Sequence, residues 1–241
     1  MTENPARRFY KEAAAASATP PDAGPFTVTL DGRPVKTPGA KPLSLPTNAL
    51  ALAVAEEWQA QDETIKPTSM PMMQLACTAL DRVGAERDAV AARIADFGNA
   101  DLLCYRATEP ADLVARQTDA WQPILDWLAD ELGAALNVRS GITHIAQPAE
   151  SLAALADVLA AYDEFELTVV AEIAQVYSSL GLALAVERGR LDRDDALSAA
   201  WIDEAFQNEQ WGEDHEAMDR RRNLKADADA AVRFLSLCRE C

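Results

Sequence analysis

The chain has 241 residues, of which 49% are hydrophobic and 25% charged, enough apolar sequence for one large domain or two small ones. Its 39 acidic and 22 basic residues give a formal net charge of −17, which argues against nucleic acid and anionic membranes as partners, because both attract Lys and Arg. No run of about 18 uncharged apolar residues occurs, and the N-terminus MTENPARRFYKE lacks a secretory signal. We therefore expect no membrane insertion and a cytoplasmic location.

Most of the strand-like and turn-like sequence precedes residue 47. Phe26–Leu30 alternates apolar and hydroxyl side chains, which predicts a half-buried strand. Asp31 and Gly32 predict a hairpin turn, because glycine accepts positive φ without a steric penalty. Residues 33–37 are the expected returning strand, at a sheet edge because it contains proline, and residues 43–45 predict another short strand.

From Thr47 onward the apolar residues recur at spacings of three and four, which predicts helices almost to the C-terminus. Thr47 or Asn48 is expected to cap the first helix, and Gly133 to end a helix over residues 121–132. The apolar stripe from Val169 to Leu184 predicts one central, nearly all-buried helix. We therefore predict an α+β fold, with a small mixed α/β N-terminal domain (residues 1–70) and a larger all-α C-terminal domain (residues 71–241).

Motifs for nucleotide chemistry and for nucleophilic catalysis are absent from the sequence. Lys36-Thr37 lies in DGRPVKTPG, which lacks the glycine spacing of a phosphate-binding loop and is followed by a turn. The Rossmann glycine pattern and the GxSxG, HExxH and EF-hand patterns do not occur either. We therefore expect no nucleotide binding, no cofactor and no catalytic residue.

The acidic run at residues 213–216 (Glu-Asp-His-Glu) has two interpretations. It can be drawn as a metal site, but consecutive residues on a helix point in different directions. It can also be the acidic first turn of a helix whose arginines follow at residues 220–222, and we favour this second interpretation. Cys238 and Cys241 form a single CxxC without further ligands, so we predict no metal site and inert thiols, leaving any other role of this pair open.

The segment from Leu197 to Arg222 combines aromatic and acidic residues. Trp201, Phe206 and Trp211 lie among acids and amides in LSAAWIDEAFQNEQWGEDHEAMDRRR. The aromatic side chains can face the core while the polar ones face water. Alternatively, aromatic anchors surrounded by polar groups form a protein-binding surface. The sequence favours neither interpretation over the other.

At these residues the chain resembles the ATP synthase assembly chaperones that are specific for the alpha subunit. The motifs that carry the resemblance occur in the family's order: RRFYKE, LDGRPVKTPG, LPT, AEEWQAQ, IKPTSMP, QLACTALDRV, DLLCYRA, QTDAWQPILDW, DEAFQ and WGEDHEA. They cover most of the chain except roughly residues 134–165.

The resemblance implies a molecular chaperone and not an enzyme. Such a protein binds the unassembled alpha subunit of the catalytic head, shields its apolar interface and hands it to the beta subunit. Many members are mitochondrial and begin with a transit peptide; this chain shows none, which implies a bacterial member in the cytoplasm. The resemblance also implies a partner-binding set in the C-terminal motif: Asp203, Glu204, Phe206, Gln207, Trp211, Gly212, Asp214 and Glu216.

Two alternatives stay open beside this expectation. One is a general holdase without a dedicated client, and the other is an enzyme with an acidic metal site around residues 213–216. The sequence leaves open the surface that contacts the client, the oligomeric state, the affinity and release trigger, and the role of the N-terminal domain.

Overall fold

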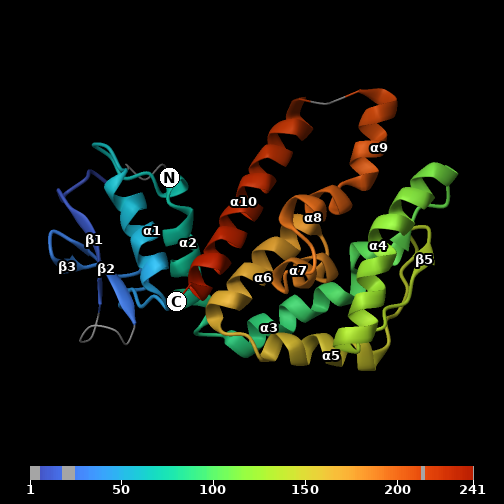
Figure 1. Ribbon diagram of the computed structural model, residues 1–241, viewed down its shortest axis with the longest axis horizontal. Coiled ribbons are helices and arrows are strands. Elements are labelled where there is room, and N and C mark those ends of the chain that lie inside the picture. Colours follow the sequence, from blue (N-terminus) through green and yellow to red (C-terminus); the bar gives the residue numbers. More distant parts are fainter. Residues whose placement is uncertain (1–5, 18–24, 213–214, 241) are drawn as a thin grey trace. The chain divides into compact units, whose positions relative to one another are not determined.

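The computed structural model describes residues 6–17, 25–212 and 215–240 (Figure 1). It divides into two compact units. The first unit contains residues 1–86, 163–169 and 230–241, and the second contains residues 87–162 and 170–229. The helices α6 (Glu164–Tyr177) and α10 (His215–Arg239) therefore each contribute residues to both units. A functional domain boundary near residue 70 stays a prediction.

The first unit contains a three-stranded antiparallel sheet in the order β1-β2-β3. Its strands are β1 (Ala13–Ser17), β2 (Phe26–Leu30) and β3 (Arg33–Pro34), and α1 (Asn48–Gln59) packs on β1 and β2 (Figure 1). Asp31 and Gly32 have φ values of 49° and 77°, which confirms the predicted hairpin turn between β2 and β3. Pro34 lies on an edge strand, where its missing N–H breaks no ladder.

This sheet differs from the prediction in three places. The prediction overlooked β1, whose sequence Ala-Ala-Ala-Ala-Ser favours helix by propensity; pairing along all of β2 and packing under α1 override that preference. The expected strand at residues 43–45 is reduced to a single bridge between Phe26 and Leu45. The returning strand is likewise shorter than residues 33–37.

After α1 the first unit continues with η1 (Pro67–Ser69), α2 (Pro71–Thr78) and the π-helical η2 (Ala79–Val83). Side-chain hydrogen bonds hold the first turns of α1 and α2. The Thr47 hydroxyl accepts a hydrogen bond of 3.1 Å from the Leu50 N–H, as predicted, and donates one of 2.6 Å to the Leu237 carbonyl. The Glu57 carboxylate accepts hydrogen bonds from the N–H groups of Met72 and Met73, at 2.7 and 2.9 Å, and so caps α2.

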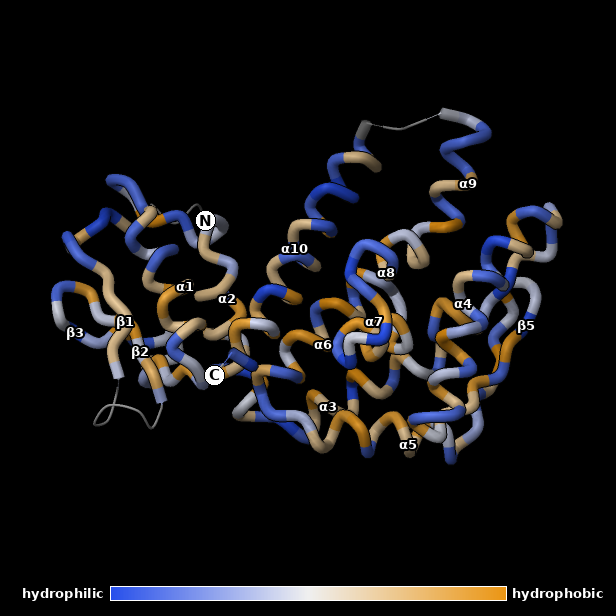
Figure 2. The backbone as a smooth tube through the Cα atoms, viewed as in Figure 1, coloured by the Kyte–Doolittle hydropathy of each residue, from blue (hydrophilic) through white to orange (hydrophobic). Residues whose placement is uncertain are grey.

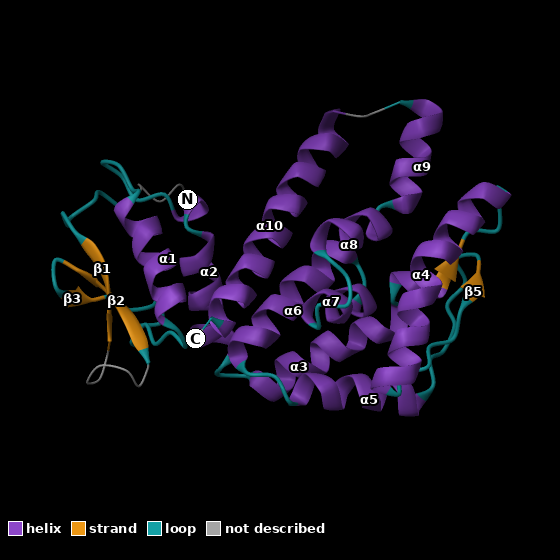
Figure 3. Cartoon of the chain, in the orientation of Figure 1, coloured by secondary structure: helices purple, strands orange, loops and turns teal. Residues whose placement is uncertain are grey.

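The second unit is mainly helical and contains α4 (Ala111–Leu132) and one short parallel pair of strands (Figure 3). Gly133, with φ 68°, ends α4 at the predicted residue. The elements of this unit, besides α6 and α10, are α3 (Arg87–Ala95), η3 (Asp96–Ala100), η4 (Leu102–Cys104), β4 (Tyr105–Arg106), α4 (Ala111–Leu132), β5 (Arg139–Ser140), α5 (Ala149–Ala160), α7 (Leu180–Glu187), α8 (Arg193–Ala200) and α9 (Ile202–Trp211).

The apolar stripe from Val169 to Leu184 forms two helices, α6 and α7, and not the single helix predicted. Ser178, with φ 52°, breaks the helix, and the Ser179 hydroxyl caps α7 through the Leu182 N–H at 3.0 Å. The buried carboxylate of Asp101 accepts hydrogen bonds from the Ser179 hydroxyl at 2.7 Å and from the Gly181 N–H at 2.9 Å. A polar group from a distant part of the sequence therefore stabilises the break. Burial raises the pKa of Asp101, although these donors oppose the rise.

Hydropathy along the backbone separates the core helices from the exposed ones (Figure 2). Every residue of α7 is buried, whereas α9 and the first half of α10 are mostly hydrophilic. Within the described residues, no helix combines the length and the apolar character needed to cross a membrane.

Candidate partner-binding surface

The predicted partner-binding residues lie along α9, at Gly212 directly after it and at the start of α10, except that Asp214 lies outside the described residues. We call the described members the α9–α10 surface: Asp203, Glu204, Phe206, Gln207, Trp211, Gly212 and Glu216. Acidic residues begin both helices, where carboxylates interact favourably with the helix dipole. Gly212 ends α9 with φ 88°, a conformation that favours glycine, and its N–H donates to the Asn208 carbonyl at 2.9 Å.

The aromatic residues of this segment divide between the core and the surface. Phe206 is only 8% exposed, and the Arg116 guanidinium carbon lies 5.4 Å from the centre of its ring. Trp211 is 81% exposed at the last residue of α9. Phe206 therefore matches the core-facing interpretation of the sequence, whereas Trp211 faces solvent. The protein-binding interpretation stays a prediction.

Asp203 is held by a buried side chain of α4. The Gln117 amide nitrogen donates a hydrogen bond of 2.6 Å to the Asp203 carboxylate, and the Gln117 side-chain oxygen accepts one of 2.7 Å from the Ala107 N–H. The guanidinium of buried Arg106 donates to the Gln117 carbonyl at 2.7 Å and lies over the Trp121 ring, 5.0 Å from its centre. These contacts fix the first turn of α9 on the core of the second unit.

Glu204 links α9 to α10. Its carboxylate accepts a hydrogen bond of 2.9 Å from the Arg221 Nε, and the same guanidinium lies over the Trp201 ring, 5.4 Å from its centre. Half-buried Trp201 and the ion pair therefore hold the two helices together close to the α9–α10 surface. Arg221 is one of the three arginines at residues 220–222 that we predicted to interact with the helix dipole. It also makes this contact with another helix.

A second ion pair joins α4 to the exposed side of α9. Arg116 Nη1 lies 2.8 Å from a Glu209 carboxylate oxygen, with both side chains about half exposed. This contact lowers the pKa of Glu209 and raises the pKa of Arg116. Because both groups are solvated, we expect the pair to orient α9 more than it stabilises the fold.

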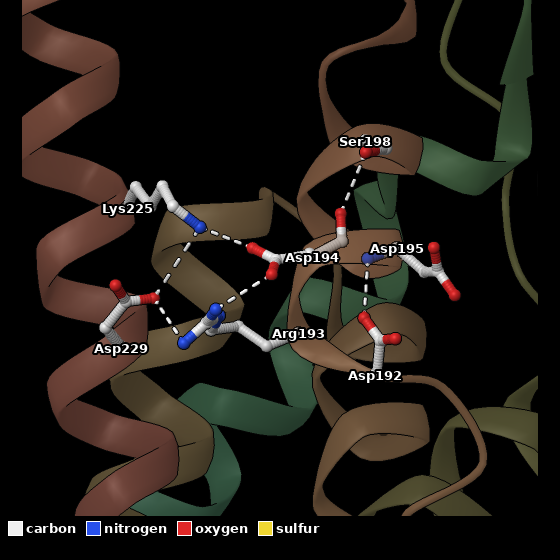
Figure 4. Close-up of polar contacts among 7 residues, drawn as sticks. All are labelled: Asp192, Arg193, Asp194, Asp195, Ser198, Lys225 and Asp229. Atoms are coloured by element: carbon white, nitrogen blue, oxygen red, sulfur yellow. Dashed lines mark hydrogen bonds and ion pairs between the residues drawn. The ribbon is translucent and has the colours of Figure 1, made fainter.

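A cluster of charges fastens the first half of α10 to α8 (Figure 4). The Asp194 carboxylate lies between Arg193, at 2.9 Å, and the Lys225 ammonium group, to which it is hydrogen-bonded. Asp229 contacts the same two cations from α10, at 2.7 Å from Arg193 Nη1 and 3.9 Å from Lys225 Nζ. The hydrogen bonds from Arg193 and Lys225 lower the pKa of Asp194 to about 2.

Three of the four cysteines lie among the described residues. Burial raises the pKa of Cys104 and of Cys238 to about 12, and Cys77, Cys104 and Cys238 are free thiols. Cys241 is not among the described residues. Across residues 6–17, 25–212 and 215–240, no three His, Cys, Asp or Glu side chains are placed to hold a metal ion. Two members of the acidic run, Glu213 and Asp214, fall outside these ranges, so both interpretations of that run stay predictions.

Comparison with known proteins agrees with the motifs and with the fold. The sequence model of the ATP12 chaperone protein family matches residues 7–129. The crystal structure of Atp12 from Paracoccus denitrificans has 42% sequence identity and a TM-score of 0.91, over 97% of this chain and 99% of that chain. The Agrobacterium tumefaciens protein Atu1473 has 41% identity and a TM-score of 0.88, over 95% of this chain and 85% of that chain.

A mitochondrial relative is also similar to this chain, at lower sequence identity. Protein atp12 of Schizosaccharomyces pombe is 23% identical over 248 residues, covering 97% of this chain and 83% of the relative. The likeness in fold to the Paracoccus and Agrobacterium structures covers at least 95% of this chain. The chain therefore belongs to the ATP12 chaperone family, the family of ATP synthase assembly chaperones that its motifs resemble.

Proposed function

We propose that this chaperone binds the unassembled alpha subunit of the ATP synthase catalytic head, shields its apolar interface, and hands it to the beta subunit. The α9–α10 surface is the proposed contact. The observation that carries the proposal is Trp211, which is 81% exposed at the end of a helix whose neighbouring residues are acidic or amide.

An exposed tryptophan next to polar groups has the composition of a protein-binding hot spot. Tryptophan buries a large apolar area on binding and loses little conformational entropy, and such anchors are surrounded by polar residues that exclude water. Gln207 and Glu216 lie within five positions of Trp211 in the sequence, are exposed, and supply such polar groups. An unassembled subunit exposes apolar surface that aggregates when uncovered, so an apolar anchor suits this client.

The contacts beneath the surface support a preorganised site. Gln117 holds Asp203, Arg221 holds Glu204, and Phe206 is buried beneath α9, so the helix that carries Trp211 is fixed before a client arrives. Preorganisation lowers the entropic cost of binding. The acidic residues of this surface favour a client face that carries Lys or Arg, because charge complementarity raises association rates and selects orientation.

Binding and release in this scheme need no nucleotide. A chaperone that binds only the unassembled subunit stabilises it by mass action, and the beta subunit displaces it by competing for the same face. The proposed affinity is therefore modest, on the order of micromolar to tens of nanomolar, which a standard interface of roughly 1,600 Å² can supply.

The test compares protection of purified alpha subunit from aggregation, followed by light scattering, by the wild type and by Trp211→Ala. We expect Trp211→Ala to protect at least about tenfold less well at equal concentration, because a hot-spot tryptophan contributes at least about 2 kcal/mol to binding. The matched control is Ile142→Ala, which removes another exposed apolar side chain of the second unit (99% exposed) and should protect like the wild type.

Two outcomes would overturn parts of the proposal. Equal protection by Trp211→Ala and Ile142→Ala, with both proteins folded, removes the α9–α10 surface from client binding. Equal protection of the alpha subunit and of an unrelated unfolded protein indicates a general holdase without a dedicated client.

A further inference from the structure

The first unit carries a groove that the proposed function does not use. Two hollows of about 530 and 520 Å³ share Trp58 and Lys36 in their linings. The first hollow is also lined by Phe9 and Tyr10, and the second by Met70 and Met73. We call the two hollows together the Trp58 groove. Its lining residues all lie within residues 9–78, inside the first unit.

Aromatic rings form one wall of the groove. Phe9 and Tyr10 meet edge to face with ring centres 5.4 Å apart, and Tyr10 and Trp58 do so at 5.6 Å. The Tyr10 hydroxyl donates a hydrogen bond of 2.6 Å to the Trp58 carbonyl, which fixes the two rings. Phe9 is 73% exposed and adds an accessible apolar ring to the first hollow.

The indole N–H of Trp58 has no acceptor among the described residues, although the nitrogen atom is buried. A buried indole N–H almost always finds a hydrogen-bond partner, because leaving the donor unpaired is unfavourable. Trp58 lines both hollows, so a molecule in the groove can supply the missing acceptor. Because this donor is unpaired, the groove favours a ligand that carries a hydrogen-bond acceptor.

The groove also carries positive charge in a protein of net charge −17. Arg33 and Lys36 are exposed at its rim, and neither makes an ion pair with another residue in the described part of the chain. The one carboxylate in the lining, Asp31, accepts from the N–H groups of Lys11 and Glu12, at 3.1 and 2.9 Å, and its single negative charge offsets only one of the two cations. The two cations therefore favour a carboxylate on the ligand.

We propose that the Trp58 groove binds an extended polypeptide segment that has apolar side chains and one carboxylate side chain. In this arrangement a backbone carbonyl of the segment accepts from Trp58, and its carboxylate pairs with Lys36 and Arg33. Alternate side chains of an extended segment point to the same face, so two of them reach neighbouring hollows. The groove is a second client contact on a different unit from the α9–α10 surface.

The test uses the full-length protein and a nine-residue, end-blocked probe peptide of alternating Thr and Val with one central Glu. Binding is followed by fluorescence anisotropy of the labelled peptide and by the indole N–H resonance of Trp58. The variant Trp58→Phe assigns this resonance by removing it while keeping an aromatic ring. We expect the resonance to shift on titration, and Lys36→Glu and Trp58→Phe each to weaken binding about tenfold, since each removes one strong hydrogen-bonding partner.

Matched controls separate the groove from general electrostatics. Arg93→Glu makes the same charge change at an exposed site of the second unit and should bind the probe like the wild type. The counterpart peptide with Lys in place of Glu should bind at least about tenfold more weakly. Trp211→Ala should bind the Glu peptide normally, which keeps this test independent of the α9–α10 surface.

Equal binding of the Glu and Lys peptides would overturn the proposal, as would a Trp58 resonance that stays unmoved at saturating peptide. An equal loss in Lys36→Glu and Arg93→Glu would also overturn it, because net charge and not the groove would then govern binding.

Discussion

The amide nitrogen of Gln117 donates a hydrogen bond of 2.6 Å to the carboxylate of Asp203, 86 positions later in the chain. Gln117 is only 1% exposed, so the core of α4 sets the position of the first turn of α9. The same side chain accepts from the Ala107 N–H, and Arg106 donates to its backbone carbonyl. One glutamine thus connects the core of the second unit to the surface that carries Trp211.

Replacing this glutamine tests the connection. We expect Gln117→Ala to lower the free energy of unfolding by about 2 to 3 kcal/mol, because the Ala107 N–H and the Asp203 carboxylate both lose a buried partner. Urea denaturation measures the change. Thr118→Ala, one residue along the exposed side of α4, should change stability by less than about 0.5 kcal/mol. Similar losses in the two variants would show that Gln117 does not hold α9.

The ion pair between Glu204 and Arg221 predicts a charge-swap result. We expect Glu204→Arg and Arg221→Glu each to destabilise the protein by about 1 kcal/mol, because each places like charges between α9 and α10. The double variant should recover most of that loss. Urea denaturation of the four proteins gives the coupling energy. Strictly additive losses would show that the two residues act independently.

The Asp194 cluster predicts a pH-dependent contribution to stability. The folded pKa of Asp194, about 2, lies below its ordinary value of 3.8. Its ion pairs therefore stabilise the folded protein fully above about pH 4, and this stabilisation is lost as the pH falls towards 2. The difference in Tm between the wild type and Asp194→Asn should shrink over that interval at low salt. Asp195→Asn is the control at the neighbouring position, and a gap that stays constant down to pH 2 would contradict the assignment.

The buried carboxylate of Asp101 predicts the largest loss of stability. We expect Asp101→Ala to lower the free energy of unfolding by at least about 3 kcal/mol, because Ser179, Gly181 and Leu103 all lose an acceptor. Thermal or urea denaturation measures this loss. The control Asp96→Ala removes an exposed carboxylate one turn earlier and should have little effect. A loss below 1 kcal/mol would show that other contacts hold the break between α6 and α7.

The fold could be predicted wherever a local signal decides it. The alternation of β2, the turn at Asp31 and Gly32, and the stop at Gly133 depend on neighbouring residues and were predicted correctly. The strand β1 and the break before α7 depend on distant partners. An alanine run becomes a strand because β2 pairs with it, and Asp101 stabilises the break from 78 positions away. The periodicity of a single segment predicts neither the pairing of β1 with β2 nor the contact of Ser179 with Asp101.

For the candidate site, too, local sequence alone does not decide which side chains are buried. Trp211 follows Phe206 by five residues, a rotation of about 140° on a helix, so the two rings cannot share one face. That spacing predicts that one is buried and the other exposed, but not which one. In the sequence, Gln117 and Arg106 stand out only as members of the family motifs QTDAWQPILDW and DLLCYRA. The signal that could have singled out Gln117 is a polar residue at a core position of the apolar stripe of α4.

We propose that the chain recognises the alpha subunit through the exposed end of α9. This recognition is measured by co-expressing the tagged chain with the alpha subunit or with the beta subunit and quantifying the protein that co-purifies. We predict that alpha co-purifies with the wild type and with Ile142→Ala, that Trp211→Ala retains little of it, and that beta is not retained. Retention of beta in place of alpha, or equal retention of alpha by all three proteins, would contradict the account.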